Sequence, residues 1–299
     1  MATTASVPLT GAPNIAVATP AVRQRSTLSL LMRNRMAVAG AAVVAIWIVL
    51  AIVAPLIVPY DPIEQQVRLR LQGPSAVHVL GVDELGRDVF SRVLYGGRVS
   101  LPVAAVVVLL ATAFGTLYGG LSGFLGKWVD EGAMRLVDMV LAFPSLILAM
   151  AIAAALGPSI QNSMLALLLV WWPPYARLAR GQVLGLKNRD FVVAARALGM
   201  SEWRVLLRHV LPNSIAPAIV LSTMDFGNAI IITAALSFLG LGAVPPTPEW
   251  GAMVAEGREL MQAWWISTFA GLAIFSVAMA CNFVGDGLRD VIDPRIRGR

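Results

Sequence analysis

The sequence predicts an all-α polytopic membrane protein with six transmembrane helices. Of its 299 residues, 58% are hydrophobic and only 13% are charged, so the chain lacks the polar surface that a water-soluble domain of this length needs. Apolar runs long enough to cross about 30 Å of hydrocarbon as helices recur along the chain. The predicted spans are residues 36–58, 99–123, 136–156, 163–182, 213–241 and 264–286.

The positive charges indicate how the chain is oriented in the membrane. The formal net charge is +6, but the 23 Lys and Arg residues lie in short segments between apolar runs and not on one basic face, which argues against nucleic-acid binding. Six spans put both ends of the chain on one side, and most of the Lys and Arg residues fall on that side. We therefore expect both termini to be cytoplasmic.

The predicted spans divide the chain into five segments. Residues 1–35 are expected to be a cytoplasmic tail that begins disordered, because its first part is rich in Ala, Thr and Pro and carries no charged side chain. Residues 36–58 form the first span, and residues 59–98 form an extracytoplasmic loop. Residues 99–288 are the transmembrane core, and residues 289–299 are a cytoplasmic C-terminus.

The outer loop is expected to contain an amphipathic helix over residues 84–95. Asp83 is its candidate N-cap, and Asp88 and Arg92 are spaced to pair one helical turn apart. Its apolar stripe comprises Leu85, Val89 and Val93. Such a helix would lie flat on the outer membrane surface, either with a specific role or as a plain connector.

A loop of about 30 residues, 183–212, follows the fourth span and is longer than two membrane helices need to reverse direction. Asp190 is a candidate N-cap of a first short helix, and Gly199 suits the left-handed position that would end it. Ser201 can cap a second helix, which Pro212 is expected to end. The sequence of the loop therefore predicts two short helices that meet at a turn formed by Gly199, the glycine elbow.

Each of these short helices has an apolar face. The first face comprises Phe191, Ala194, Ala195 and Leu198, and the second comprises Trp203, Leu206, Leu207 and Val210. Small side chains would let the first helix sit deep in a groove of another protein, while the surrounding arginines keep the loop out of the bilayer. The alternative is an ordinary helical hairpin between two spans.

The stretch AARALG at residues 194–199, followed by RHVLPN at 208–213, resembles the EAA loop of ABC import permeases. In that family the loop docks into a cleft of the ATP-hydrolysing subunit. The glutamate that names the motif would fall at Val193, so the resemblance implies docking by shape and apolar contact more than by charge. The residues expected to couple to the ATPase are Ala194, Ala195, Leu198, Gly199 and Trp203.

Three further segments, residues 80–92, 245–251 and 285–294, are similar to the C-type permease of dipeptide, oligopeptide, glutathione and nickel importers. The likeness covers about residues 30–297. It implies the type I ABC importer permease fold in a bacterial plasma (inner) membrane, and import of dipeptides or short oligopeptides by alternating access. Glutathione and nickel complexes are the alternative substrates.

The resemblance also implies partners. The residues of this chain indicate that ATP is hydrolysed by another polypeptide. The expected partners are a second homologous permease, two ATP-binding subunits that use ATP and magnesium, an extracytoplasmic substrate-binding protein, and membrane lipid. The chain has no phosphate-binding glycine loop of the Walker type, no recognisable catalytic set, and no metal-ligand spacing around His78 or His209. We expect neither enzyme activity nor a bound cofactor or metal. The competing classes are an ion-coupled secondary transporter and an intramembrane enzyme.

Several residues within the spans are candidates for transport itself. Asp225 is a costly acid in the fifth span, where it either lines the path and meets a substrate's ammonium group or forms a hydrogen bond with another helix, with Asn228 nearby. Pro144 should bend the third span, and Pro173 with Pro174 should bend the fourth. These bends are either hinges or only features of packing.

Small residues in the second span predict a close contact between helices. Gly119, Gly120 and Gly123 leave its backbone bare on one side. We expect that side to meet the second permease of the pair.

Overall fold

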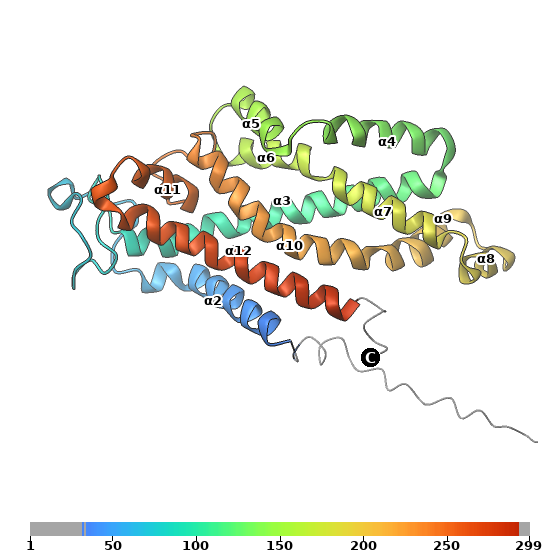
Figure 1. Ribbon diagram of the computed structural model, residues 1–299, viewed down its shortest axis with the longest axis horizontal. Coiled ribbons are helices and arrows are strands. Elements are labelled where there is room, and N and C mark those ends of the chain that lie inside the picture. The colour runs from blue at the N-terminus through green and yellow to red at the C-terminus, as the bar shows by residue number, and fades with distance from the viewer. Residues whose placement is uncertain (1–31, 33, 293–299) are drawn as a thin grey trace, which may run out of the picture.

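The computed structural model describes residue 32 and residues 34–292 and is nearly all helical (Figure 1). The α-helices are α2 (Arg35–Ile57), α3 (Val89–Leu125), α4 (Lys127–Leu141), α5 (Ser145–Leu156), α6 (Ile160–Trp171), α7 (Pro173–Leu186), α8 (Asp190–Ala197), α9 (Glu202–Val205), α10 (Leu211–Phe238), α11 (Trp250–Arg258) and α12 (Trp265–Ile292). Short 3₁₀ turns cover Val67–Leu69 and Met261–Ala263, and a π turn covers Leu206–Val210. Most of the expected tail, 1–35, and the end of the expected C-terminus, 289–299, lie outside the described residues.

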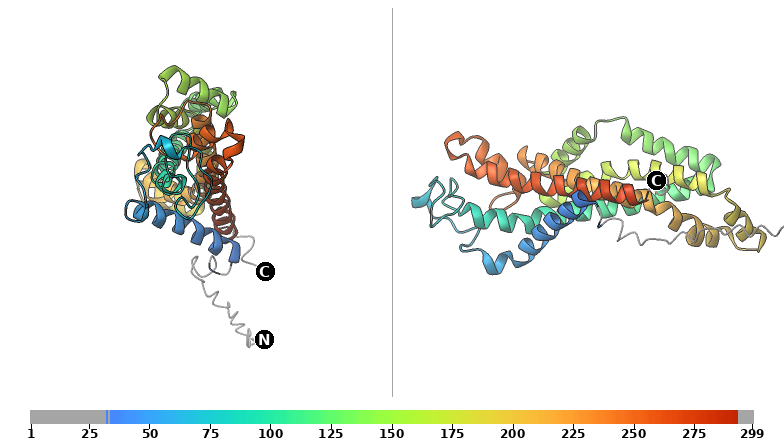
Figure 2. Two further views of the ribbon diagram at one scale, coloured as in Figure 1. Left: turned by 90° about the vertical axis from the view of Figure 1, so that its left-hand side faces the viewer. Right: turned by 60° about the horizontal axis from the view of Figure 1, so that its bottom comes forward.

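The long helices run side by side along the longest axis of the molecule. Figure 1 shows α3, α10 and α12 in this arrangement, with α8 and α9 at one end and α11 with the 59–88 segment at the other. Figure 2 shows that the loop of α8 and α9 extends beyond the end of α12. Helices α4 to α7 pack on one side of this bundle.

Four helices among the described residues are long and apolar enough to cross a membrane: α2, α3, the continuous helix Glu202–Phe238, and α12 over Trp265–Val291. The pair α4 and α5, which meet at an angle of 85°, passes the same test of length and composition only when taken together, as a broken span or a re-entrant loop. The prediction of a polytopic helical protein is confirmed, but the count of six spans is not. The predicted third and fourth spans are each broken in two, because a proline interrupts the hydrogen bonding of each.

The predicted outer-surface helix over residues 84–95 is wrong. Gly86 has φ of 81° and breaks the chain there, and the helix begins only at Val89. Asp88 is the N-cap, because its carboxylate accepts a hydrogen bond from the backbone N–H of Ser91 at 2.8 Å. The expected cap, Asp83, instead accepts the backbone N–H groups within its own turn. The amphipathic stretch is therefore the first part of the 37-residue α3.

The predicted ion pair between Asp88 and Arg92 is also wrong. Asp88 contacts the ring of His78, with 2.9 Å between Oδ1 and Nδ1. Arg92 donates from Nη2 to both carboxylate oxygens of Glu256 on α11, at 3.1 Å each. Arg87 donates to the same carboxylate at 3.0 Å. Both arginines are fully buried and also form ion pairs with Asp83, so the two carboxylates, Asp83 and Glu256, together neutralise the two positive charges inside the protein.

Helix α11 is held against α3 by a second set of contacts. The ring of Trp250 is fully buried, and its Nε1 donates to the carbonyl oxygen of Val93 at 2.8 Å. A Cβ added to Gly96 would lie 2.8 Å from that ring. Glu249 caps α11 at the N–H of Ala252 and accepts the hydroxyl of Ser100 at 3.1 Å. These contacts fix α11 at one end of the bundle.

The glycines of α3 make their close contact within this chain. A Cβ added to Gly119 would lie 1.9 Å from the carbonyl oxygen of Ala176 on α7, and Gly123 meets α7 one turn later. Gly120 faces Leu211 of α10. The expectation that this side meets a second permease is wrong, because a bare glycine backbone indicates close approach without naming the partner.

Candidate coupling loop and transport path

The loop between α7 and α10 folds as two short helices joined at Gly199. Helix α8 ends at Ala197, and Gly199 follows in the left-handed conformation with φ of 81°. The backbone N–H groups of Gly199 and Met200 return to the carbonyls of Arg196 and Ala195, at 2.9 and 3.2 Å. Helix α9 then begins after Ser201. The predicted glycine elbow is confirmed.

Two predicted boundaries of this loop are wrong. Asp190 is the first residue of α8, and Arg189 is its N-cap. Pro212 does not end the second helix, because α9 continues through a π turn into α10 with Pro212 in the first turn of α10. A π turn shifts the backbone hydrogen bonds by one residue and accommodates a proline that a regular helix interior would not.

The inner side of the loop forms its own small core. Ala195 is buried there, although the sequence places it among the residues that contact a partner. It packs into a cluster with Val192, Val205, Leu206, Val210 and Leu211. Ala195 is therefore not available for docking, because the side of α8 that carries it closes against α9 and α10.

The outer side of the loop exposes large apolar side chains. Leu198 is 85% exposed at the elbow, and Trp203 is 57% exposed on α9. Ala194 also faces outward. Phe191 and Leu207 extend the same exposed set. Four of the five coupling candidates, Gly199 among them, thus lie at the surface of the loop.

An ion pair that sequence spacing did not suggest fixes the elbow. Arg196 and Glu202 lie on opposite sides of Gly199, and the guanidinium donates from Nε and Nη2 to the two carboxylate oxygens at 3.0 and 3.1 Å. Arg196 also donates to the carbonyl of Lys187 at 3.1 Å, and Lys187 Nζ donates to the carbonyl of Gly123 on α3 at 3.1 Å. The loop is therefore tied both to itself and to the bundle.

Asp225 connects the two helices that enter and leave this loop. Its Oδ2 accepts the hydroxyl of Tyr175 on α7 at 2.7 Å, and its Oδ1 accepts the amide of Asn228 at 3.3 Å. The structure thus brings Asp225 and Asn228 together, and it shows the hydrogen bond to another helix that the second of the two hypotheses for Asp225 predicts. Sequence reasoning missed Tyr175, because nothing local marks it as the partner of a residue 50 positions away.

The proline candidates lie at breaks in the helices. Pro144 precedes α5 at the 85° bend from α4, and Pro173 with Pro174 begins α7 directly after α6. The predicted bends are confirmed. A hinge role for these prolines stays a prediction.

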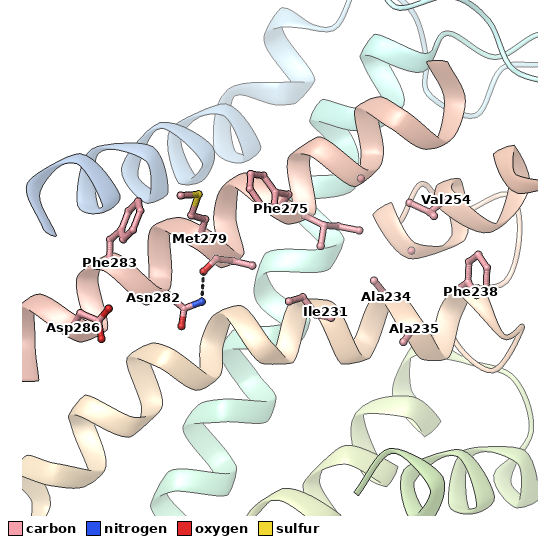
Figure 3. A pocket seen from close by; sticks show the side chains of 14 residues that line it. Ile231, Ala234, Ala235, Phe238, Val254, Phe275, Met279, Asn282, Phe283 and Asp286 are labelled. Atoms are coloured by element: carbon pink, nitrogen blue, oxygen red, sulfur yellow. Dashed lines mark hydrogen bonds between the residues drawn. The ribbon is translucent and has the colours of Figure 1, made fainter. Parts of the chain in front are cut away.

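A groove between α10, α11 and α12 has a volume of about 760 Å³. Figure 3 shows Val254 of α11 toward one end and Asp286 at the other. The lining is apolar apart from Asp286 and Asn282, whose amide donates to the carbonyl of Ala278 at 2.9 Å. No group of three or more His, Cys, Asp or Glu side chains that could hold a metal occurs within residues 34–292.

Comparison with known families gives two matches. The family described as "binding-protein-dependent transport system inner membrane component" matches residues 115–298. The family described as "N-terminal TM domain of oligopeptide transport permease C" matches residues 25–74. Together the two matches cover most of the chain.

Curated relatives are similar along nearly the whole length. A dipeptide transport system permease protein of Alkalihalophilus pseudofirmus is 44% identical over 274 residues, which cover 91% of this chain and 90% of the relative. A probable D,D-dipeptide transport system permease protein of Escherichia coli (strain K12) is 44% identical over 271 residues, covering 90% and 91%. A glutathione transport system permease protein of Escherichia coli O1:K1 / APEC is 46% identical over 268 residues, covering 89% and 88%.

Among solved structures, an inward-facing form of the MetNI methionine ABC transporter matches with a TM-score of 0.57 and 15% identity, covering 68% of this chain and 98% of that one. This likeness shows the shared permease fold. The family match over residues 115–298 and the identity to permeases along the chain agree with this fold. The chain belongs to the family of binding-protein-dependent transport system inner membrane components, the permease subunits of ABC importers.

Proposed function

We propose that this permease imports dipeptides or short oligopeptides into the cytoplasm. Two of its relatives are named for dipeptides, and the third is named for glutathione, which is itself a short peptide. Identity of 44% to 46% does not separate these substrates. Uptake of a labelled dipeptide, a labelled oligopeptide and labelled glutathione by the assembled transporter decides between them.

The observation that carries the proposed mechanism is the exposed apolar surface of the coupling loop. Leu198 and Trp203 lie at the end of the molecule on a loop that also carries Arg196 and Arg204. Such a loop is too charged for the bilayer and too apolar to favour water, which supports docking on another protein. We infer that an ATP-binding subunit docks there, and that ATP and magnesium act on that subunit.

The loop is positioned to transmit motion into the membrane. Helix α7 leads into it, α10 leads out of it, and the Tyr175 to Asp225 hydrogen bond joins the two. A displacement of Gly199 and its neighbours would therefore tilt α7 and α10 together as a rigid pair. The breaks at Pro144 and Pro173 are the proposed hinges. Asp225 is the proposed contact for a substrate ammonium group.

The proposal also includes an orientation in the membrane and a set of partners. The end that carries α8 and α9 lies in the cytoplasm, together with both chain termini, and the end that carries α11 faces the other side of a bacterial plasma membrane. A second homologous permease completes the path, two ATP-binding subunits drive it, and an extracytoplasmic binding protein delivers the substrate.

The test compares Leu198→Asp with Met261→Asp, an equally exposed position at the opposite end of the molecule. We expect the first variant to lose the co-purifying ATPase and ATP-dependent uptake, because a charge replaces the apolar contact. The second variant should keep the ATPase bound. Retention of the ATPase by Leu198→Asp would contradict the docking site. Peptide transport by the lone chain on an ion gradient would contradict the proposed function.

A further inference from the structure

The turn between α3 and α4 exposes a group of large apolar side chains. Gly126 and Lys127 both have positive φ, of 69° and 52°, and they reverse the chain between the two helices. Leu125 before them, and Trp128 and Val129 after them, are 49%, 86% and 53% exposed. We call these three side chains the turn surface. Large apolar side chains that gather on a surface are typical of a binding site.

Three hydrogen bonds hold the turn surface in one place. Asp130, in the first turn of α4, accepts the hydroxyl of Ser122 on α3 at 2.6 Å. The same carboxylate accepts hydrogen bonds from Nε and Nη2 of Arg180 on α7, at 2.6 and 2.7 Å. A guanidinium that binds both carboxylate oxygens fixes the geometry of the pair more strictly than a single hydrogen bond does. The start of α4 is therefore tied to α3 and to α7, and Trp128 is presented at a defined position.

The turn surface lies beside the coupling loop. Lys187, where α7 enters the loop, donates from Nζ to the carbonyl of Gly123, and a Cβ added to Gly126 would lie 3.9 Å from that Nζ. The guanidinium of Arg196 on α8 lies over the ring of Phe124, 5.8 Å from its centroid. Figures 1 and 2 both show the α3–α4 turn and α8 at the same end of the molecule, beyond the end of α12. A large protein docked on the loop therefore has the turn surface within reach.

The charged ends of α2 and α12 mark the cytoplasmic side of the hydrocarbon. Asn34, directly before Arg35, donates from Nδ2 to Oδ2 of Asp290 at 3.5 Å, so the two helices end at the same level. Between Trp265 and Asp286, α12 carries no charged side chain, and this stretch is about 32 Å long, close to the thickness of the hydrocarbon. The hydrocarbon therefore ends near Asp286.

The same level crosses α3 near Gly115. Gly285 directly precedes that aspartate and packs against Met224 of α10. The next residue of α10, Asp225, accepts the hydroxyl of Tyr175 on α7, and Tyr175 in turn packs against Gly115. These contacts place Gly115 beside the end of the hydrocarbon.

The turn surface is too far from this level to lie among the lipid headgroups. Helix α3 continues from Gly115 to Leu125, a length of about 15 Å. The headgroup layer on one side of a bilayer is only about 5 to 8 Å thick. A tilt of about 40°, the upper end of the range for membrane helices, still leaves about 11 Å. Trp128 is therefore not an interfacial tryptophan, and its exposed ring fits a second protein better than lipid.

The coupling loop alone offers a small surface for docking. Helix α8 has 8 residues and α9 has 4, and part of each is buried in the loop's own core. A stable protein–protein interface uses about 20 to 30 residues from each partner. Further contacts between this chain and the docked subunit are therefore expected at the cytoplasmic end.

We propose that the turn surface is a second docking site for the ATP-binding subunit that docks on the coupling loop, with Trp128 as its anchor. The inference rests on the proposed docking of that subunit. Tryptophan is enriched among the side chains that contribute most to binding, because its ring buries a large, rigid apolar area. Since Asp130 joins α4 to α7, a subunit bound at both places holds α3, α4 and α7 together as it moves.

Photo-crosslinking in the assembled transporter identifies what covers Trp128. Trp128 is replaced by p-benzoylphenylalanine, and Met261, which is 87% exposed at the opposite end, is replaced in the control. We expect irradiation to join the Trp128 variant to the ATP-binding subunit, identified by mass, and to leave the Met261 variant unattached to it. Adducts at Trp128 only with the second permease, only with lipid, or with nothing would overturn the proposal.

The second test measures how tightly the ATP-binding subunit binds to the permease pair in nanodiscs. Trp128→Ala should weaken this binding by about tenfold or more, the usual loss for a tryptophan anchor, while Trp128→Phe should keep most of the affinity. Trp264→Ala is the matched control, since Trp264 is also exposed but lies at the opposite end, and it should bind normally. The melting temperature checks that Trp128→Ala keeps its fold. Equal affinities of Trp128→Ala and Trp264→Ala would overturn the anchor.

Docking on the loop and docking on the turn surface fail separately. If Leu198→Asp keeps the ATP-binding subunit bound, the proposed docking on the coupling loop fails, whatever the Trp128 variants do. If Leu198→Asp releases the subunit while Trp128→Ala binds it normally, only the second docking site fails.

Discussion

Replacement of Gly199 by valine should uncouple ATP hydrolysis from transport. Gly199 has φ of 81° at the elbow between α8 and α9. A Cβ there would meet no atom within 4 Å, so the whole cost comes from the backbone. A left-handed conformation costs an L-residue roughly 1 to 2 kcal/mol, and a β-branched side chain lies at the upper end of that range. A penalty of that size lowers the population of the formed elbow relative to alternative loop conformations by roughly 5- to 30-fold.

The assay measures substrate uptake and ATP hydrolysis in the same reconstituted complex. Gly199→Val should lower the number of peptides imported per ATP, because the loop no longer presents Leu198 and Trp203 in one arrangement. Gly199→Asn is the matched variant, since asparagine tolerates the left-handed conformation, and it should keep most of the coupling. Gly132→Ala is the control for a glycine in open space within a helix, and it should transport normally.

The reasoning would be refuted by normal coupling in Gly199→Val. It would also be refuted if Gly199→Asn and Gly199→Val were impaired equally, because the left-handed backbone would then not be the cause. Hydrogen exchange of the Gly199 amide, which bonds to the carbonyl of Arg196 at 2.9 Å, checks that the valine variant opens the elbow.

Three further predictions concern the bundle. Glu256→Gln removes a charge that two buried arginines share, so it should lower the free energy of unfolding by about 3 kcal/mol in detergent. The control, Glu259→Gln, changes a carboxylate that is 77% exposed and should alter the free energy of unfolding little. Gly119→Ala should force α3 and α7 apart and lower the thermal stability and the yield of folded protein; an unchanged melting temperature would contradict the packing. Asp225→Asn should reduce uptake more than Tyr175→Phe, which breaks the same hydrogen bond but keeps the charge; equal losses would indicate a structural role only.

The sequence by itself determined the class of fold and the nature of the coupling loop. Apolar runs must form helices in a bilayer, because hydrocarbon offers no hydrogen-bond partner for a bare backbone. The left-handed conformation of Gly199 can also be predicted from the sequence, because the residue that ends a helix often adopts this conformation and glycine adopts it without steric cost. Pro144 and Pro173 likewise predict helix breaks that the structure contains. These features depend on a few consecutive residues.

Tertiary structure decided which residues meet across the bundle. Arg92 pairs with Glu256, 164 residues later, and not with the acid one turn before it. Gly119 contacts α7 of the same chain, although a bare glycine backbone could pack closely against any helix. Ala195 turns into the loop's own core, because the packing of α8 on α9 sets which side of a short helix faces outward. Such choices depend on how whole helices pack together, and the local pattern around each residue is compatible with several answers.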